Sequence, residues 1–353
     1  MQNLINQAPP KKNYDFIDSI RCVAMMAIVA EHSVGSYVFA PGSTKYWCYI
    51  SFIQLTKFGT IAFFLLAGFL ISENFTNYTP TQYLRRRVST TFGPWVFWSL
   101  VYVVAMIINI HIKAGIYHDN EFNLANILNQ VKIVYLYTNY WFIINFLVSI
   151  TILLVFRRYL YSIYFGAILL LFTLFYTINI HYEWIDPSHT TAILGFVFFL
   201  WLGAQLRKNW EQVDSIMVKT SWLAIIVLLL LTFGLSVYEI NVLNNIKSID
   251  PLNTLRFSSV LFSLVAFALL LKVKTFGFTK YLHPRQTTYG IYLIHYIIIS
   301  FVLPQVFIHL TINDSAIPVF YLIKVLTIIG VYLLTYFIVI GISRSPFKKL
   351  IGV

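Results

Sequence analysis

Residues 15–33 read DFIDSIRCVAMMAIVAEHS, a largely apolar run that is long enough to cross a bilayer and still carries ionisable side chains. Similar apolar runs recur along the whole 353-residue chain, which is 59% hydrophobic and only 11% charged. A soluble domain typically has about 25% charged residues, so lipid must be the solvent for much of this surface. The sequence therefore predicts an all-α fold, a polytopic transmembrane helical bundle.

About ten runs approach the roughly 20 apolar residues that a helix needs to cross the hydrocarbon core of a membrane. They are 17–39, 48–72, 91–112, 140–157, 160–179, 190–206, 219–240, 256–272, 287–309 and 318–342. The longest predicted loop between them runs from 113 to 139.

The basic residues predict the orientation of these spans, because cytoplasmic loops carry an excess of Lys and Arg. Most of the 25 basic residues fall in alternate connections, and both ends of the chain belong to that set. We therefore expect a cytoplasmic tail at 1–16, a single transmembrane domain at 17–343 and a second cytoplasmic tail at 344–353. The protein is predicted to be multi-pass in the inner (plasma) membrane, surrounded by lipid. Topology explains the net charge of +12, so no nucleic acid is expected as a partner.

Arg21 and His32 are the most informative ionisable pair in the first run. Eleven residues are almost three turns of helix, so the two side chains share a face and lie about 16 Å apart along the axis. Histidine is the natural general base near neutral pH, and arginine offers a forked site for phosphate oxygens. The structural alternatives are a snorkelling anchor for Arg21 and a helix-packing hydrogen bond for His32. Glu31 points about a quarter-turn away from His32.

The second span adds further charge inside or beside the membrane. Lys57 precedes FGTIAFFLLAGFLIS (58–72), in which Gly59 and Gly68 predict close helix packing. The consecutive residues Arg85–Arg87 follow this span. They are either a topogenic anchor or an electropositive mouth for a polyanionic donor such as coenzyme A, and both readings can hold together.

Weaker candidates lie on two later spans. Trp141 and Asn145 are spaced (i, i+4) and predict one helix face. Tyr292 and His295 follow Tyr289 at three-residue steps, although a structural hydrogen bond explains His295 equally well. An outer-loop cluster, His181, Glu183, Asp186 and His189, matches no metal-site spacing, so no metal is expected. Nucleotide-binding, dinucleotide-binding, zinc-protease and nucleophile-elbow motifs are missing from the sequence.

These stretches together resemble the acyltransferase-3 family of membrane O-acyltransferases, the bacterial type that acetylates cell-surface glycans. The first run resembles its first-helix signature, an Arg and a His separated by ten residues. FGTIAFFLLAGFLIS resembles its second-helix motif, and Lys57 stands where many relatives have a basic residue. YWFIINFL (140–147) resembles a middle-helix Trp-Phe motif, and TYGIYLIHY (288–296) a late-helix motif ending in Leu-Ile-His. One departure is that Arg85–Arg87 are consecutive, whereas many relatives carry two arginines three apart.

The resemblance implies transfer of an acyl group, most often acetyl, from cytoplasmic acyl-CoA to a hydroxyl of a carbohydrate or glycan. The donor is a substrate, and no tightly bound cofactor is implied. The expected catalytic residues are His32 as general base, Glu31 as its orienting partner and Arg21 on the donor side. The expected donor-binding residues are Lys57, Arg85, Arg86 and Arg87. The expected acceptor or cavity residues are Trp141, Asn145, Tyr292 and His295.

Two other functions compete with this one. Intramembrane His, Glu and Lys side chains would also suit a proton-coupled transporter or flippase of a glycan or lipid-linked intermediate. Paired broken helices and an inverted repeat, which are typical of such transporters, are not apparent in the sequence. A non-enzymatic membrane partner or sensor is the third alternative.

Overall fold

The computed structural model describes residues 14–35, 39–74, 79–117, 121–307 and 316–353, and these residues form helices without any β-strand. The α-helices are α1 (Asp15–Ser33), α2 (Thr44–Thr56), α3 (Phe58–Asn74), α4 (Pro80–Arg87), α5 (Gly93–Tyr117), α6 (Leu124–Tyr137), α7 (Trp141–Val155), α8 (Ile163–Tyr182), α9 (Val197–Lys208), α10 (Trp210–Lys219), α11 (Trp222–Asn245), α12 (Phe257–Val273), α13 (Pro284–Ile297), α14 (Leu303–Phe307) and α15 (Ile317–Ser343). The π-helical turns are η1 (Val88–Phe92) and η4 (Ile298–Val302), and the 3-10 turns are η2 (Arg157–Tyr159), η3 (Gly277–Leu282) and η6 (Lys348–Ile351).

Six helical segments of the described chain are long and apolar enough to cross a membrane. They are Thr44–Ser72, Pro80–Ile116, Ile163–Tyr182, Trp222–Asn245, Pro284–Phe307 and Ile317–Ser343. Leu124–Tyr137 and Trp141–Val155 meet the same test together, with a bend of 54° between them, and make a seventh if they form one span. These segments confirm the predicted all-helical, multi-pass membrane protein.

Three of the predicted spans are helical but do not meet that test. The span 17–39, of which 36–38 lie outside the described residues, corresponds to α1, which is rich in charged side chains. The span 190–206 corresponds to α9, with 12 residues, and 256–272 corresponds to α12, with 17. The full count of ten and the cytoplasmic orientation of the termini stay predictions.

The predicted loop 113–139 is wrong for most of its length. Helix α5 continues to Tyr117, and α6 occupies Leu124–Tyr137. Asn123 begins α6 as an N-cap, because its side-chain oxygen accepts a hydrogen bond of 2.9 Å from the backbone N–H of Asn126.

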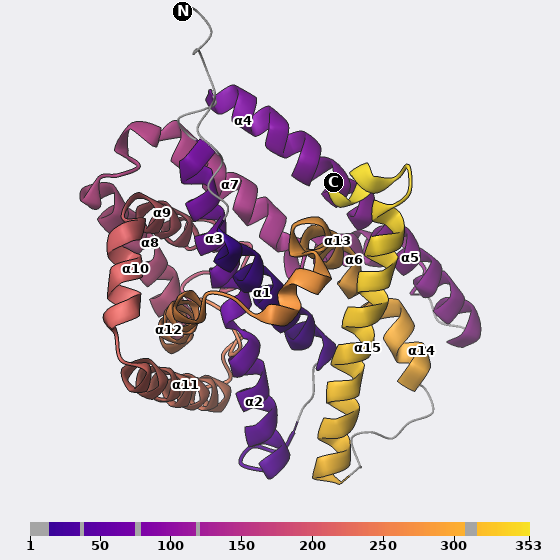
Figure 1. Cartoon of the computed structure of the whole chain (residues 1–353). Helices are drawn as coiled ribbons and strands as arrows, with labels where there is room; N and C mark the ends of the chain where they lie inside the picture. Colours follow the sequence, from indigo (N-terminus) through magenta and orange to yellow (C-terminus); the bar gives the residue numbers. More distant parts are fainter. Residues whose placement is uncertain (1–13, 36–38, 75–78, 118–120, 308–315) are drawn as a thin grey trace, which may run out of the picture.

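Helix α1 runs through the middle of the bundle, with α3, α13 and α15 packed around it (Figure 1). Ile20, Ala24 and Met25 on α1 are completely buried. A helix that carries several charges is therefore surrounded by protein over most of its length, which shields its polar groups from lipid.

Helices α3 and α9 contact each other backbone to backbone. A Cβ added to Gly68 would lie 1.9 Å from the carbonyl oxygen of Leu200, and one added to Gly203 would lie 2.1 Å from that of Leu65. A Cβ at Gly59 would lie 2.8 Å from the carbonyl oxygen of Ala24 on α1. The close packing predicted at Gly59 and Gly68 is confirmed.

Candidate active site

Arg21 lies in a cluster of charges near the start of α1. Its Nη1 donates a hydrogen bond of 3.0 Å to Oδ1 of Asp18, one turn earlier on the same helix. Arg285, in the first turn of α13, donates from Nε to the other oxygen of Asp18 at 2.6 Å. One carboxylate therefore joins two guanidinium groups on two helices and leaves an excess of positive charge.

A cavity of about 290 Å³ opens beside this cluster, and we call it the arginine cavity. Arg21, Arg87 and Arg285 line it, together with Thr90 and Thr91 of the π-helical turn η1. Arg87 is held in place by its Nε, which donates to the hydroxyl of Tyr83 at 2.8 Å. A cavity with three guanidinium groups suits a phosphorylated ligand.

The arginine triplet divides between this cavity and the surface. Arg87 lines the arginine cavity, whereas Arg85 and Arg86 are exposed and are not among its lining residues. The geometry thus separates Arg87 from its two neighbours, which the consecutive sequence alone could not do.

His32, near the end of α1, contacts His295, near the end of α13. Nδ1 of His32 lies 2.9 Å from Nε2 of His295, and the two rings are nearly parallel, with centroids 5.2 Å apart. Nδ1 of His295 lies 2.9 Å from the carbonyl oxygen of Ile291. Because a carbonyl can only accept, Nδ1 of His295 carries the proton, and its Nε2 in the neutral ring is an acceptor. Nδ1 of His32 is then the donor, and Nε2 of His32 is the unprotonated, basic nitrogen.

Helices α1 and α13 are therefore parallel neighbours with matched polar residues. Arg21 and Arg285 share Asp18 at one end, and His32 and His295 are hydrogen-bonded at the other. About 16 Å of helix separates the two levels.

Glu31 and Lys57 form an ion pair next to His32. Nζ of Lys57 donates to Oε1 of Glu31 at 2.7 Å, and the side chains are only 7% and 15% exposed. Lys57 lies at the junction of α2 and α3, where its backbone N–H bonds to Gln54 in a tighter turn. The nearest charged partner of Glu31 is thus Lys57, while the imidazole of His32 bonds to His295.

A second cavity, of about 410 Å³, lies at this end, and we call it the histidine cavity. It is lined by His32, by the Glu31–Lys57 pair and by the aromatic residues Tyr137, Trp141, Phe142, Tyr292 and Tyr296. Asp186 and Asp250 add two carboxylates to the wall, and Asn139 adds a buried amide. The amide oxygen of Asn139 has no hydrogen-bond partner among the described residues.

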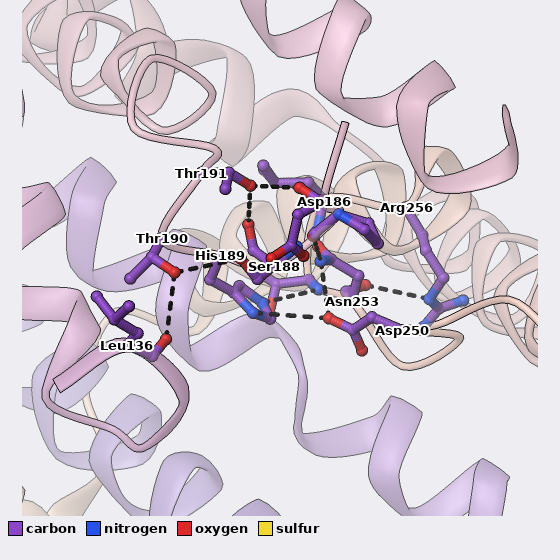
Figure 2. Close-up of polar contacts among 12 residues, drawn as sticks. Leu136, Asp186, Ser188, His189, Thr190, Thr191, Asp250, Asn253 and Arg256 are labelled. Carbon is purple, nitrogen blue, oxygen red and sulfur yellow. Dashed lines mark hydrogen bonds and ion pairs between the residues drawn. The ribbon is translucent and has the colours of Figure 1, made fainter. Parts of the chain in front are cut away.

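His189, in the segment between α8 and α9, lines the same cavity. Figure 2 shows its polar contact with Asp250. Its Nε2 accepts from the backbone N–H of Thr254 at 3.3 Å, so its Nδ1 carries the proton and lies 3.7 Å from Asp250. Burial lowers the pKa of His189 to about 4, against a smaller opposing effect of Asp250. Trp141 stacks on the imidazole of His189 with 4.6 Å between ring centroids. Nδ2 of Asn145 donates to the backbone carbonyl of His189 at 2.8 Å.

Except for Arg85 and Arg86, which line neither cavity, the predicted residues fall into two groups. Those around the histidine cavity are Glu31, His32, Lys57, Trp141 and Tyr292, with Asn145 and His295 directly behind them. Those around the arginine cavity are Arg21, Arg87 and again Tyr292. The shared face predicted for Trp141 and Asn145 agrees with their common partner, His189.

Some residues were missed or placed differently by sequence reasoning. Sequence reasoning did not single out Arg285, although it stands ten residues before His295 and Arg21 stands eleven before His32. Arg256, the first residue of the predicted span 256–272, was not singled out either. It is completely buried and donates to Gln54, Ser236 and Asn253.

The cluster that was considered for a metal separates in the structure. His181 bonds to Glu239, Glu183 accepts from the backbone N–H of Ile249, and Asp186 accepts from that of Ser188. Within the part of the chain that is described, no group of three His, Cys, Asp or Glu side chains could hold a metal ion.

The apolar helices and their enclosed polar groups define a multi-pass membrane protein with two cavities of different charge. Comparison with known families gives a more specific assignment. The chain belongs to the acyltransferase-3 family, whose acyltransferase domain matches residues 14–340. The family implies acyl transfer at a membrane. Neither a curated protein nor a solved structure matches the chain.

Proposed function

We propose that the protein is a plasma-membrane O-acyltransferase that moves an acyl group, most often acetyl, from cytoplasmic acyl-CoA to a hydroxyl of a carbohydrate or cell-surface glycan. The hydrogen bond between His32 and His295 carries this proposal. It fixes the tautomer that leaves a basic nitrogen on His32, beside a cavity large enough for a sugar ring.

The donor is proposed to bind at the arginine cavity. Coenzyme A is a polyanion, and Arg21, Arg87 and Arg285 supply three guanidinium groups that match phosphate oxygens. The positive-inside pattern of the loops supports a cytoplasmic position for this end of the bundle. The flexible pantetheine arm would then extend along α1 toward His32.

The acceptor is proposed to bind in the histidine cavity. Trp141, Tyr137 and Tyr296 offer aromatic surface to the apolar face of a sugar ring. Asp186, Asp250 and the unpartnered oxygen of Asn139 offer acceptors for its hydroxyl groups.

The reaction is a single acyl transfer. Nε2 of His32 takes the proton from the acceptor hydroxyl while that oxygen attacks the thioester carbonyl carbon. The ammonium of Lys57 stabilises the negative charge that develops on the carbonyl oxygen. The carbon–sulfur bond then breaks, the thiolate leaves with the electron pair and takes the proton from His32, and the new ester remains on the acceptor. His295 acts as a positioning residue, because it orients His32 without lining the cavity.

The test uses purified protein in proteoliposomes with acetyl-labelled acetyl-CoA and a panel of neutral, amino-sugar and uronic-acid oligosaccharides. We expect His32→Ala to lower transfer by about 100-fold or more, the usual contribution of a general base. His295→Ala should lower kcat and shift its pH profile. The matched control is His111→Ala on α5, because His111 is exposed and lines neither cavity.

Two results would overturn the proposal. Full transferase activity in His32→Ala would refute the role of the base. Movement of a labelled glycan across the vesicle membrane without acyl-CoA would favour the transporter, against which the family assignment already weighs.

A further inference from the structure

The arginine cavity and the histidine cavity meet at three side chains. Ile28, Phe142 and Tyr292 line both cavities, whereas Arg21 lines only the first and His32 only the second. We call these three side chains the partition. An acyl group that enters with a donor bound at Arg21 must pass the partition before a hydroxyl activated by His32 can reach it.

Ile28 and Tyr292 are held firmly in the partition. Ile28 packs into the notch left by Gly59, since a Cβ at that glycine would lie 2.9 Å from Cγ1 of Ile28. The hydroxyl of Tyr292 donates to the backbone carbonyl of Asn139, and Nδ2 of Asn139 donates back to the carbonyl of Tyr292 at 3.0 Å. These reciprocal bonds tie α13 to the residues just before α7.

Phe142 is enclosed by other aromatic rings. Its ring centroid lies 5.0 Å from that of Phe64, 5.6 Å from that of Tyr292 and 6.0 Å from that of Phe146. A close-packed aromatic cluster of this kind resists insertion of extra methylene groups, because neighbouring side chains must leave their preferred rotamers.

The partition also presents an apolar surface to a passing acyl group. Ile28 and Phe142 offer no hydrogen-bonding group, and the hydroxyl of Tyr292 is already bonded to Asn139. A carboxylate that passed here would lose water without finding a partner, which is unfavourable. The barrier therefore opposes long acyl groups and charged acyl groups for separate physical reasons.

We propose that Ile28, Phe142 and Tyr292 select the acyl group, admitting acetyl and rejecting longer or anionic acyl groups such as hexanoyl and succinyl. This inference rests on the proposed function, because it assumes that acyl-CoA binds at the arginine cavity. A pocket that discriminates against one extra methylene typically gives a preference of about 10-fold to 200-fold, and hexanoyl carries several more methylenes than acetyl. We therefore expect a preference of at least about 10-fold for acetyl-CoA over hexanoyl-CoA. We also expect acetyl-CoA to be preferred over succinyl-CoA, because the partition offers no partner to the succinyl carboxylate.

The experiment measures kcat/KM for acetyl-, butyryl-, hexanoyl- and succinyl-CoA in the proteoliposome assay, with wild type, Ile28→Ala, Ile28→Val and Phe142→Leu. The matched control is Phe262→Leu, because Phe262 on α12 is buried, packs against Phe233 and lines neither cavity. Each preference is a ratio of two donors on one preparation, so a smaller folded fraction cancels from it.

We expect the preference for acetyl over hexanoyl to fall at least about threefold in Ile28→Ala and Phe142→Leu, less in Ile28→Val and not at all in Phe262→Leu. Equal use of acetyl-CoA and hexanoyl-CoA by the wild type would overturn the inference, and so would unchanged ratios in both partition variants. Failure of the wild type to transfer an acyl group from any of the four donors would instead refute the proposed function.

Discussion

The ion pair between Lys57 and Glu31 offers the sharpest test of how this membrane domain tolerates charge. Its atoms are 2.7 Å apart and both side chains are largely buried. At an effective dielectric constant of about 20, the attraction is about 6 kcal/mol. Most of this offsets the cost of removing both charges from water, but loss of one partner leaves the other charge uncompensated.

We therefore expect Lys57→Met and Glu31→Gln each to lower the free energy of unfolding by about 3–5 kcal/mol. The double variant should be more stable than Lys57→Met, because Gln in place of Glu31 leaves no buried charge. Unfolding would be followed by titration of detergent-solubilised protein with SDS. Lys113→Met is the control, since Lys113 on α5 is exposed.

A double-mutant cycle tests whether the charges of Lys57 and Glu31 are energetically coupled. A coupled buried pair would be refuted if the losses in free energy of unfolding from Lys57→Met and Glu31→Gln simply added in the double variant. It would also be refuted if Lys57→Met lowered the free energy of unfolding no more than Lys113→Met does. Measurement of transfer activity separates the role of Lys57 in catalysis from its role in stability. If the Lys57 ammonium stabilises the oxyanion, the double variant should regain stability but remain poorly active.

Two further predictions concern packing and pH. Gly68→Ala should lower the free energy of unfolding by about 1–3 kcal/mol or more, because the new Cβ meets the backbone of α9. The control is Gly330→Ala on α15, where the new Cβ has open space around it, and this variant should be neutral or slightly stabilising. Equal effects of the two variants on the thermal midpoint would contradict the close packing at Gly68. His189 has a folded-state pKa of about 4, below its unfolded value of about 6.5, so its contribution to stability is present above about pH 6.5 and is lost as the pH falls toward 4. His189→Gln should flatten the fall of the thermal midpoint between pH 7 and pH 5, and an unchanged slope would show that other groups cause it.

The sequence predicted the parts of the site that depend on one helix. Helical periodicity placed Arg21 and His32 on a common face and turned Glu31 away from it. The structure is consistent with this, because Glu31 pairs with Lys57 on another segment. Glycine patterns similarly predicted the close approach at Gly59 and Gly68.

Contacts between side chains of different helices could not be predicted from the sequence. The partner of His32 is 263 residues away, and its choice depends on the axial register of α1 against α13, which only packing determines. Arg256 illustrates the same limit. Its place at the start of the predicted span 256–272 does not reveal that it is fully buried and links α2, α11 and α12. Helix α6 is different, because Asn is a preferred N-cap residue and Asn123 therefore indicates the start of this helix from the sequence itself.

The parallel arrangement of α1 and α13 also constrains the topology. Two parallel helices in a membrane require an odd number of crossings between the end of the first and the start of the second. Between them lie four of the long apolar segments and the bent pair of α6 and α7. If that pair is one crossing, these account for an odd number already. The two short helices α9 and α12 must then either both cross the membrane, as in the ten-span prediction, or both fail to cross. If the bent pair is one crossing, a topology in which only one of α9 and α12 crosses would reverse α13 and separate His295 from His32, which disagrees with their 2.9 Å hydrogen bond.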